Sequence, residues 1–404
     1  MKPLVVMKFG GSSVADAEKI KKVAARIIAK KEQGNDVAVV VSAMGDTTDH
    51  LIELAKSISD DPPDREMDML MSSGEQISMA VLSMAIQAMG HDAVSLTGPQ
   101  AEIITDNSHR RARILDIKAT RVKQELARGK IVIVAGFQGI SGDSEITTLG
   151  RGGSDTTAVA LAHALNADVC EILTDVPGVF TADPRIVRNA RKLDEIVFDE
   201  MLELASMGAK VLNSRAVEMA SKYGVVLKVG LAHVEAPGTI IRREDASMEQ
   251  MLVRGVAHDL DQVKLTVHRV PDKPGVAAKI FTTLADKGVN VDMIIQNISE
   301  DGYADLSFTV STSDIEKIST IMNRIKNEVN AENVTSDINI AKVSIVGVGM
   351  RSHAGVAQKV FKTLGDNGIN IKMISTSEIK ISVVVDKDRA KDTVIALHEA
   401  FDLG

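Results

Sequence analysis

The chain has 404 residues, which at roughly 150 residues per domain predicts two or three domains rather than one. Its composition, 45% hydrophobic and 25% charged, excludes a disordered or fibrous protein. Nucleic-acid binding needs a basic stripe or aromatic platforms on which bases stack. The chain has a formal net charge of −8, no long Lys/Arg run and few aromatic residues (8 Phe, 2 Tyr, no Trp), which argues against such binding.

Cysteine content and hydropathy indicate the compartment. The single cysteine, Cys170, excludes an intrachain disulfide and a Cys-rich zinc site, and it fits a reducing environment. No stretch approaches the roughly 18–20 apolar residues of a membrane-spanning helix, and Lys8 interrupts the first apolar run before it reaches signal-peptide length. We therefore expect a cytoplasmic protein that acts on small molecules, with no membrane or nucleic-acid partner.

Residues 1–240 alternate short apolar runs with longer segments of helical periodicity. The runs VAVVVSA and IVIVAG are continuously apolar, which is typical of strands buried on both faces of a sheet. Strands that alternate with helices predict an α/β fold with a mostly parallel sheet. We expect strands at Leu4–Phe9, Val37–Ser42, Ala93–Leu96, Ile131–Gly136, Val169–Thr174 and Val225–Gly230, and helices at Asp16–Glu32, Glu75–Met89, Arg110–Arg128, Ser154–Leu165 and Asp199–Met207.

The first motif, KFGGSS, follows the first strand and precedes a helix. Adjacent glycines let backbone N–H groups approach an anion, the helix N-terminus adds partial positive charge, and Lys8 supplies a full charge for a phosphoryl group. The alternative is a tight strand–helix turn with Ser12 or Ser13 as N-cap. The motif is neither a Walker A loop nor a G-x-G-x-x-G fingerprint.

Two further motifs contain carboxylates near predicted helix starts. In SSGEQ, Glu75 opens a helix rich in Met and Ala, where a carboxylate commonly complements the helix dipole. In RGGSD, two glycines precede Ser154, and Asp155 falls in the first turn of an apolar helix. Arg151 is positioned to bind a carboxylate through its guanidinium fork, although a capped helix start explains Ser and Asp equally well.

The fourth motif, TDVPGVFTADPR, begins at the end of the strand Val169–Thr174. Ligands of parallel α/β sheets bind beyond the carboxyl ends of the strands, which is where this segment emerges. Asp, Pro and Gly are also ordinary turn residues, so a purely structural turn is the alternative.

An internal repeat follows a polar, acidic boundary near residues 238–249. Gly275–Ile294 and Gly355–Ile374 match at twelve of twenty positions, at an offset of 80 residues without a gap. Around each copy the pattern reads strand, helix, strand, strand, helix, which is the start of a ferredoxin-like βαββαβ unit. We therefore expect two α+β ferredoxin-like domains after the α/β domain.

Strand counting suggests that the two repeat copies interleave. Copy one has a candidate fourth strand near Val334–Ile340, whereas copy two has none after its last helix. The strand pattern at Met251–His258 can fill that edge, so that copy one is inserted within copy two. The expected domains are then 1–245, 263–341, and 251–260 together with 342–404. Pairing of residues 251–258 with the sheet of copy one would contradict the insertion.

The four motifs, in this order and spacing, resemble the aspartokinases of the amino-acid-kinase fold, and the repeat resembles their paired ACT regulatory domains. The resemblance covers residues 2–404 and is to the monofunctional, short form. It implies ATP-dependent phosphorylation of the β-carboxylate of L-aspartate to 4-phospho-L-aspartate, the first step of lysine, threonine and methionine biosynthesis. It also implies ATP with Mg²⁺ and no metal site made by protein residues alone.

The resemblance assigns roles to the matching positions. Lys8 and Asp155 would be the catalytic residues, Glu75 would take the α-ammonium of aspartate, and Arg151 its α-carboxylate. The other substrate-side residues would be Ser42, Asp46, Thr47, Gly152, Gly153 and Ser154. The ATP-binding residues would be Lys8, Phe9, Gly10, Gly11, Ser12, Thr174, Asp175, Phe180, Asp183, Arg185 and Lys210.

In the repeat region the resemblance implies inhibition by lysine, threonine or both. Effector contacts would come from Asp272, Asn290, Val291, Asp292, Gln296 and Asn297 in copy one, and from Asn370, Ile371, Ser377 and Glu378 in copy two. Copy two has SHAGV where copy one has DKPGV, so we do not expect equivalent binding. The partner would be a second copy of the chain or a separately translated ACT-only subunit, for which Met248 and Met251 are candidate internal starts.

The chemistry needs no general base. The β-carboxylate of aspartate, with an ordinary pKa of about 3.9, is already ionised at neutral pH. None of the nine histidines lies in the glycine motifs, and His163, on an apolar helix, is predicted to be a core residue. What remains is to bring two anions together with Lys8, backbone N–H groups and Mg²⁺ on the ATP phosphates. Two other functions stay open: a related kinase acting on a different carboxylate, and an amino-acid sensor with an inactive kinase domain.

Overall fold

The computed structural model describes residues 2–207, 211–244, 252–298 and 301–404. The chain divides into two compact units. The first unit comprises Met1–Phe180, Lys192–Ala205 and Lys210–Met248, and the second comprises Thr181–Arg191, Ser206–Ala209 and Glu249–Gly404. No helix in the described parts of the chain is both long and apolar enough to span a bilayer.

The first unit is built on an eight-stranded sheet in the order β10-β12-β11-β9-β1-β2-β6-β3. The central strand β1 (Leu4–Phe9) lies between β2 (Asp36–Val41) and β9 (Val169–Thr174), and both pairings are parallel. The carboxyl ends of these three strands therefore lie at one edge of the sheet. The outer strands are β3 (Ala93–Leu96), β6 (Ile131–Ala135), β10 (Glu195–Val197), β11 (Leu227–Leu231) and β12 (Thr239–Arg242).

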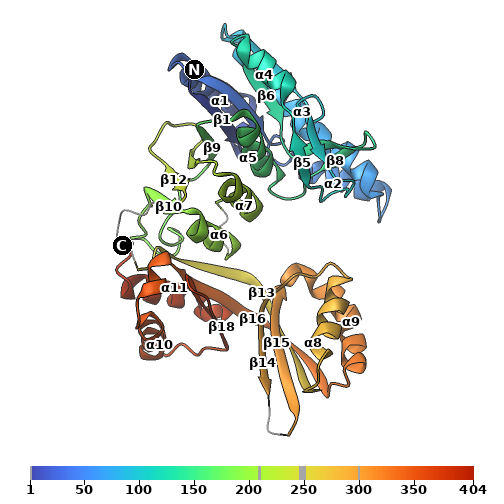
Figure 1. Ribbon diagram of the computed structural model, residues 1–404, viewed down its shortest axis with the longest axis vertical. Coiled ribbons are helices and arrows are strands. Elements are labelled where there is room, and N and C mark those ends of the chain that lie inside the picture. The colour runs from blue at the N-terminus through green and yellow to red at the C-terminus, as the bar shows by residue number, and fades with distance from the viewer. Residues whose placement is uncertain (1, 208–210, 245–251, 299–300) are drawn as a thin grey trace. The chain divides into compact units, whose positions relative to one another are not determined.

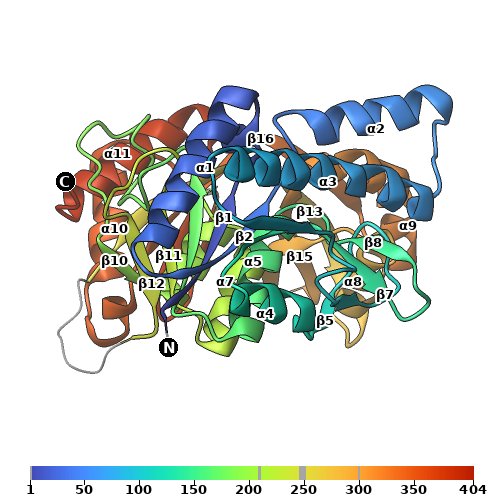
Figure 2. The same ribbon diagram turned by 90° about the horizontal axis from the view of Figure 1, so that it is seen from above.

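Helices cover both faces of this sheet. Helices α1 (Ala17–Glu32) and α3 (Asp64–Ala88) lie side by side on one face (Figure 2). Every second residue of β1 packs against them, from Val5 to Phe9, because successive side chains of a strand point to opposite faces. The other face is covered by α5 (Gly153–Leu165), which contacts β1, β2 and β9 (Figure 1). The remaining helices are α2 (Thr47–Ile58), α4 (Thr120–Ala127), α6 (Phe198–Ser206) and α7 (Ser214–Tyr223).

A second, four-stranded sheet in the first unit was not predicted. It has the order β5-β4-β7-β8 and packs against α3 through β8. The helix expected at Arg110–Arg128 is wrong in its first half, because Ile114–Ile117 forms β5 and only Thr120–Ala127 is helical. Pairing with β4 overrides the helical composition of that segment, and Ala119, at φ 52°, separates strand from helix. The other strands are β4 (Ile103–Thr105), β7 (Gln138–Ser141) and β8 (Ile146–Thr148).

The second unit contains one six-stranded sheet in the order β14-β15-β13-β16-β18-β17. Two long antiparallel strands, β13 (Gly255–Pro271) and β16 (Asn333–Val346), run through the whole sheet. Gly255 to Asp259 at the start of β13 pair with Lys342 to Val346, whereas Gln262 to His268 pair with Asn333 to Ile340. The first part of β13 thus lies beside copy two of the repeat, as the insertion requires, although the exact domain limits stay a prediction.

The helices of the second unit repeat in the same order as the sequence copies. Copy one contributes α8 (Val276–Ala285) and α9 (Ile315–Glu328), and copy two contributes α10 (Val356–Asp366) and α11 (Ala390–Ala400). Each pair covers its own apolar cluster. The remaining strands are β14 (Val291–Ile298), β15 (Tyr303–Ser311), β17 (Met373–Thr376) and β18 (Lys380–Asp386).

The six strands predicted for residues 1–240 are all present, with ends that differ by two residues at most. The α/β class and the α+β repeat are confirmed. Helices α2 and α7 and the short strands β10 and β12 were not predicted.

Candidate active site

An ion pair between Lys8 and Asp155 lies beside the carboxyl end of β1. Lys8 Nζ is 2.7 Å from Asp155 Oδ1, and each side chain is only 12% exposed. The alternation of β1 directs Lys8 to the sheet face opposite Met7 and Phe9, which is the face that α5 covers. Asp155 stands in the first turn of α5, so the two predicted catalytic residues meet between strand and helix.

Glycines allow the chain to turn tightly where β1 ends. The N–H of Gly10 donates to Leu173 O of β9 at 3.3 Å, and that of Ser42, after β2, donates to Phe9 O at 3.2 Å. A Cβ on Gly11 would lie 2.8 Å from Ala43 O, so only glycine fits there. Gly11–Val14 forms a 3₁₀ turn, and the cap of α1 is Asp16, which accepts from Lys19 N at 2.9 Å. The alternative that Ser12 or Ser13 caps this helix is therefore wrong.

Asn213 and Arg215, at the start of α7, bond to the RGGSD loop and to residues near it, and the sequence did not suggest either residue. Arg215 donates to the carbonyl oxygens of Leu149 at 3.0 Å and Ala112 at 2.8 Å. Asn213 Nδ2 donates to Arg151 O at 3.3 Å, and Gly152, at φ 73°, leaves no room for a Cβ beside this amide. The Arg151 side chain is exposed and keeps its guanidinium available to solvent. An Asn-Ser-Arg helix start was the signal that could have pointed to Asn213 and Arg215.

Glu75 lies in the middle of α3 and not at its start, so its interpretation as a helix-dipole partner is wrong. Its side chain is buried, with 3% of the residue exposed. Oε1 accepts from Ala43 N at 3.1 Å, and Oε2 has no hydrogen-bond partner within the described part of the protein. Burial raises the pKa of Glu75 to about 7, against the lowering effect of the Ala43 N–H. A buried carboxylate with one oxygen unpaired can accept a cationic group.

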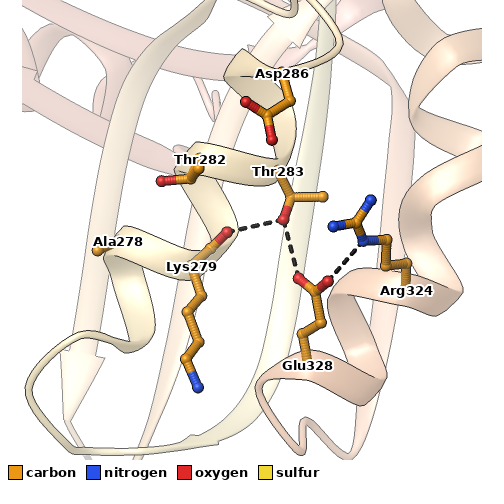
Figure 3. A pocket seen from close by; sticks show the side chains of 7 residues that line it. All are labelled: Ala278, Lys279, Thr282, Thr283, Asp286, Arg324 and Glu328. Atoms are coloured by element: carbon orange, nitrogen blue, oxygen red, sulfur yellow. Dashed lines mark hydrogen bonds and ion pairs between the residues drawn. The ribbon is translucent and has the colours of Figure 1, made fainter.

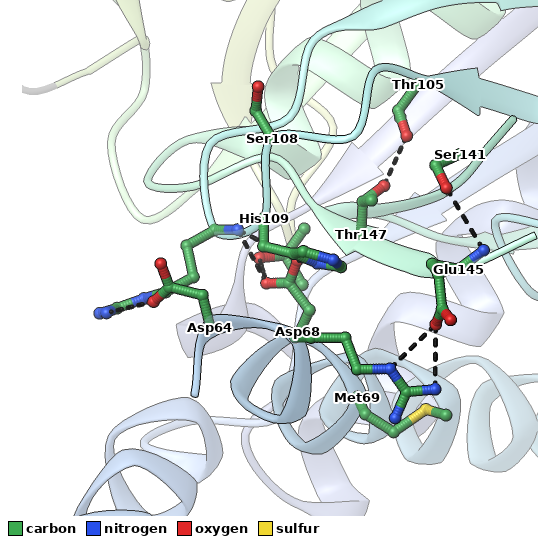
Figure 4. Close-up of polar contacts among 12 residues, drawn as sticks. Asp64, Asp68, Met69, Thr105, Ser108, His109, Ser141, Glu145 and Thr147 are labelled. Carbon is green, nitrogen blue, oxygen red and sulfur yellow. Dashed lines mark hydrogen bonds and ion pairs between the residues drawn. The ribbon is translucent and has the colours of Figure 1, made fainter. Parts of the chain in front are cut away.

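A second buried carboxylate on α3, Asp68, has a structural role. It accepts from Arg110 N at 3.0 Å and from the Thr148 hydroxyl, and His109 Nδ1 lies 2.8 Å away (Figure 4). These contacts connect α3 with β8 and with the loop before β5.

Replacing Asp68 with Ala is expected to lower the free energy of unfolding by about 3 kcal/mol or more, because buried donors lose their acceptor. Asp64→Ala is the matched control. Asp64 lies on the same helix as Asp68 and also contacts Arg110, but its side chain is largely exposed. Urea unfolding of both variants measures the difference. Equal losses would contradict a dominant role of the buried contacts.

The predicted nucleotide residues divide between the two units. Thr174 and Asp175 follow β9 at the same sheet edge as Lys8, and their side chains share a hydrogen bond of 3.0 Å. Phe180 forms a β-bridge with Lys192 in the first unit. Asp183 and Arg185 belong to the second unit and pair with each other at 2.7 Å, with 88% of the Arg185 side chain exposed. Lys210 lies outside the described residues.

Of the substrate-side residues, Asp46 is exposed and precedes α2, and Thr47 begins that helix. The Thr47 hydroxyl donates to Met44 O at 2.5 Å. Both residues lie in the loop after β2, which also supplies the Ala43 N–H to Glu75. Glu75 and this loop are therefore in contact beside the sheet edge that carries Lys8.

The predicted effector residues other than Asp272 lie on or next to the edge strands β14 and β17 of the second unit, and Asp272 follows the central strand β13. Val291, Asp292, Gln296 and Asn297 belong to β14, and Asn290 precedes it. The backbone N–H of Asp272 donates to Gly302 O at 3.0 Å. Asn370 and Ile371 precede β17, and Ser377 and Glu378 follow it. Asp292 contacts the buried Lys342 of β16. The groove between α8 and α9 in Figure 3 contains other residues, among them Lys279, Arg324 and Glu328.

His163 lies on α5, the helix whose first turn contains Asp155. The prediction that His163 is a core residue is wrong: it is exposed and its ring stacks on Tyr223, with centroids 4.1 Å apart. It lies in the last turn of α5, where the helix face turns toward α7 and solvent.

Comparison with known proteins shows matches along the chain. Residues 3–230 match the amino acid kinase family, and 264–330 and 343–401 each match an ACT domain. An aspartokinase of Mycolicibacterium smegmatis is 53% identical, covering 99% of this chain and 96% of that protein. An aspartate kinase of Pseudomonas putida is 51% identical, covering 99% and 98%.

The chain belongs to the aspartokinase family.

As an aspartokinase, the protein is an enzyme that transfers a phosphoryl group to aspartate. Among solved structures, it is similar to E. coli aspartokinase III in complex with aspartate and ADP, with a TM-score of 0.82 and 27% identity, covering 98% of this chain and 99% of that one. The structure of that enzyme with lysine and aspartate has a TM-score of 0.78, at the same identity and coverage. Because the relatives that define the family are kinases, membership of the family favours an active enzyme over a non-catalytic amino-acid sensor.

Proposed function

We propose that the protein transfers the γ-phosphoryl group of ATP to the β-carboxylate of L-aspartate, giving 4-phospho-L-aspartate, the first step of lysine, threonine and methionine biosynthesis. The observation that carries the proposal is the Lys8–Asp155 pair, at 2.7 Å, beside the carboxyl end of the central strand. The similarity to an enzyme whose solved structure holds aspartate and ADP supports the same pair of ligands.

Lys8 would neutralise charge on the transferring phosphoryl group. A carboxylate oxygen forms a bond to the γ-phosphorus while the bond from that phosphorus to the bridging oxygen breaks, and ADP leaves. No proton moves, because the aspartate carboxylate is ionised at neutral pH. Asp155 orients the Lys8 ammonium, and the N–H groups of Gly10, Gly11 and Ser12 would contact the phosphates.

Glu75 and Arg151 would position aspartate. The unpaired Oε2 of Glu75 suits an α-ammonium group, which also favours the ionised form of a carboxyl whose pKa is raised to about 7. The exposed Arg151 guanidinium suits the α-carboxylate. Ser42, Asp46, Thr47 and the Gly152–Ser154 turn would line the same space.

Mg²⁺ would be held mainly by the ATP phosphates and water. This ion needs only one or two carboxylates from a protein, and the described residues contain no cluster of three His, Cys, Asp or Glu side chains that would make a complete cage. Asp155 is the carboxylate next to Lys8, where the transferring phosphoryl group would bind, and it could supply one such ligand. The ion would reduce the repulsion between the two anionic substrates.

The remaining nucleotide contacts would come from Phe9, Thr174, Asp175, Phe180, Asp183, Arg185 and Lys210. Lysine, threonine or both would inhibit by binding at the ACT domains, through the residues of β14 and β17 named above. The lysine complex of the E. coli enzyme supports lysine as one effector. Self-association, or assembly with an ACT-only subunit made from an internal start, would accompany this regulation. The enzyme would act in the cytoplasm.

An assay with hydroxylamine trapping of the acyl phosphate tests the proposed function. Product is expected with aspartate and ATP, and its formation is expected to fall when lysine, threonine or both are added. Glutamate and acetylglutamate serve as competing acceptors. Faster product formation with either of them than with aspartate would favour the related kinase instead.

Replacing Arg151 with Ala is expected to raise the KM for aspartate about a hundredfold, because a charge-assisted contact contributes about 2–3 kcal/mol. The KM for ATP should change far less. Initial rates with each substrate varied in turn give both constants. Equal increases in the two constants would count against an α-carboxylate contact.

A further inference from the structure

The segment Thr181–Arg191 belongs to the second unit, although the residues before and after it belong to the first. Phe180 and Lys192, its two neighbours in sequence, form a β-bridge within the first unit. The segment begins with the last five residues of TDVPGVFTADPR, which include Asp183 and Arg185, and continues to Arg191. Two residues of the proposed nucleotide site therefore depend on contacts made by the ACT region.

Thr181, the first residue of this segment, forms hydrogen bonds with Arg191, the last one. Its N–H donates to Arg191 O at 2.9 Å, and its hydroxyl oxygen accepts from Arg191 N at 3.0 Å. Its carbonyl oxygen accepts from Val256 N of β13 at 2.7 Å. Thr181 is fully buried, so these hydrogen bonds do not compete with water. The segment is thus a closed loop attached to the six-stranded sheet.

A buried histidine holds the Thr181 hydroxyl. His398 Nε2, on α11, lies 2.9 Å from Thr181 Oγ1, and both residues have no exposed surface. Burial lowers the pKa of His398, so the ring is neutral at neutral pH and can bond the hydroxyl in either tautomer. Within the described residues Nδ1 has no hydrogen-bond partner. Burying an unpaired nitrogen costs free energy that an apolar side chain at this position would not cost. The contact of Nε2 with the Thr181 hydroxyl is the interaction that an apolar side chain could not make.

The turn that contains Asp183 and Arg185 follows Thr181 and has a buried residue on each side. Ala182 and Val187, on both sides of them, are buried in the apolar cluster that contains Leu397 of α11. Between these two anchors Asp183 O accepts from the N–H groups of Ile186 and Val187, both at 2.9 Å. The Asp183 carboxylate accepts from Arg185 N at 2.9 Å as well. A turn with this many internal bonds moves as one piece with its anchors.

We infer that His398 is a positioning residue for the nucleotide, acting through Thr181 on the turn that carries Asp183 and Arg185. The inference rests on the proposed function, which assigns these two residues to ATP. It makes ATP affinity depend on α11, a helix of the second ACT domain. His398 itself touches no substrate.

Two disruptive variants, Thr181→Val and His398→Leu, test this inference in the full-length chain. Each is expected to weaken ADP binding, measured by calorimetry, and to raise the KM for ATP, both about tenfold, while the KM for aspartate changes little. Because the two side chains act through one contact, the double variant should weaken ADP binding no more than either single one. The conservative variants Thr181→Ser and His398→Gln should restore ADP binding to within about threefold of the wild type.

Thr393→Val is the matched control for loss of stability. Thr393 is a fully buried threonine on the same helix, and its hydroxyl donates to Arg389 O at 2.8 Å, away from the segment. This variant should unfold at a lower urea concentration than the wild type and keep its ADP affinity. Weaker ADP binding in Thr393→Val, or unchanged ADP binding in both Thr181→Val and His398→Leu, overturns the inference.

The wild-type assay separates this inference from the proposed function. Failure of the wild type to phosphorylate aspartate rejects the function, whereas ADP binding by the six variants tests the role of His398 without any acceptor present. Hydrogen exchange supplies a readout that needs no nucleotide: the amides of residues 181–191 should exchange at least about tenfold faster in Thr181→Val than in Thr393→Val. Equal exchange in the two variants contradicts the role of Thr181.

Discussion

Replacing Lys8 with Ala is expected to lower kcat by about three orders of magnitude while the fold is kept, because a preorganised charge facing the transferring group typically contributes about 3–4 kcal/mol to the barrier. The structure strengthens this expectation in one respect. Asp155 lies 2.7 Å from the Lys8 ammonium, so the variant also leaves a nearly buried negative charge where anionic phosphates would approach. Single-turnover and steady-state rates with aspartate and ATP measure the loss.

Two companion variants make the Lys8 result specific. Lys31→Ala removes a lysine that pairs with Asp36 at 2.9 Å, at the opposite end of β2, and should leave kcat within about twofold of the wild type. Lys8→Arg keeps the charge but changes its geometry and should recover only part of the rate. A kcat within tenfold of the wild type for Lys8→Ala, with normal circular dichroism, would reject the phosphoryl role.

Replacing Glu75 with Gln is expected to raise the KM for aspartate about a hundredfold and to abolish its dependence on pH. With a pKa of about 7 in the free enzyme, the wild-type carboxyl is increasingly protonated as the pH falls below 7. A protonated carboxyl cannot pair with an α-ammonium group, so wild-type kcat/KM for aspartate should fall about tenfold per pH unit below 7. Initial rates between pH 5.5 and 8.5 measure both profiles.

The same substitution should stabilise the fold at higher pH. A carboxyl whose folded pKa of about 7 exceeds its ordinary 4.5 supports the folded state fully below about pH 4.5 and loses this contribution as the pH rises to about 7. Gln has no charge to bury and can keep the bond from Ala43 N. We expect Glu75→Gln to be about 3 kcal/mol more stable than the wild type at pH 8 and to lose this advantage near pH 5.

Glu66→Gln is the control for both Glu75 measurements. Glu66 lies on the same helix, and its side chain is largely exposed. Its substitution should change neither the aspartate KM nor the unfolding free energy by more than the effect of one surface ion pair, about 0.5 kcal/mol. A Glu75→Gln enzyme with the pH profile of the wild type would show that a different group titrates.

Local pattern was sufficient to predict six strands of the first unit, which are β1, β2, β3, β6, β9 and β11, and the helices α1, α5 and α6. β1 and β9 are short apolar runs bounded by polar residues, and runs of that kind have few alternatives once they alternate with helices. The segment at Ile114–Ile117 was mistaken for helix because its partner, Ile103–Thr105, is remote in sequence and too short to be recognised. A local sequence pattern cannot predict stabilisation that comes from pairing with a distant strand.

The candidate site shows the same division. Lys8 and Asp155 were identified from glycine-rich motifs, because these motifs describe local backbone geometry. Arg215, which bonds to Leu149 and Ala112, was missed because nothing near it in sequence shows what it contacts. Glu75 was selected as a candidate, but its interpretation as a helix-dipole partner failed, because its burial and its hydrogen bond from Ala43 N depend on the remote loop after β2 and not on its neighbours in sequence.

The amino-acid sequence by itself determined the α/β class, the repeated α+β units, the aspartokinase resemblance and the glycine turns, because each depends on residues close together in the chain. Only the tertiary structure decided that Lys8 faces Asp155, that Glu75 is buried with one unpaired oxygen, and that Thr181–Arg191 folds with the ACT region. These features depend on which surfaces meet after the chain has folded. Burial and long-range pairing set them, and neither is encoded in any short stretch of residues.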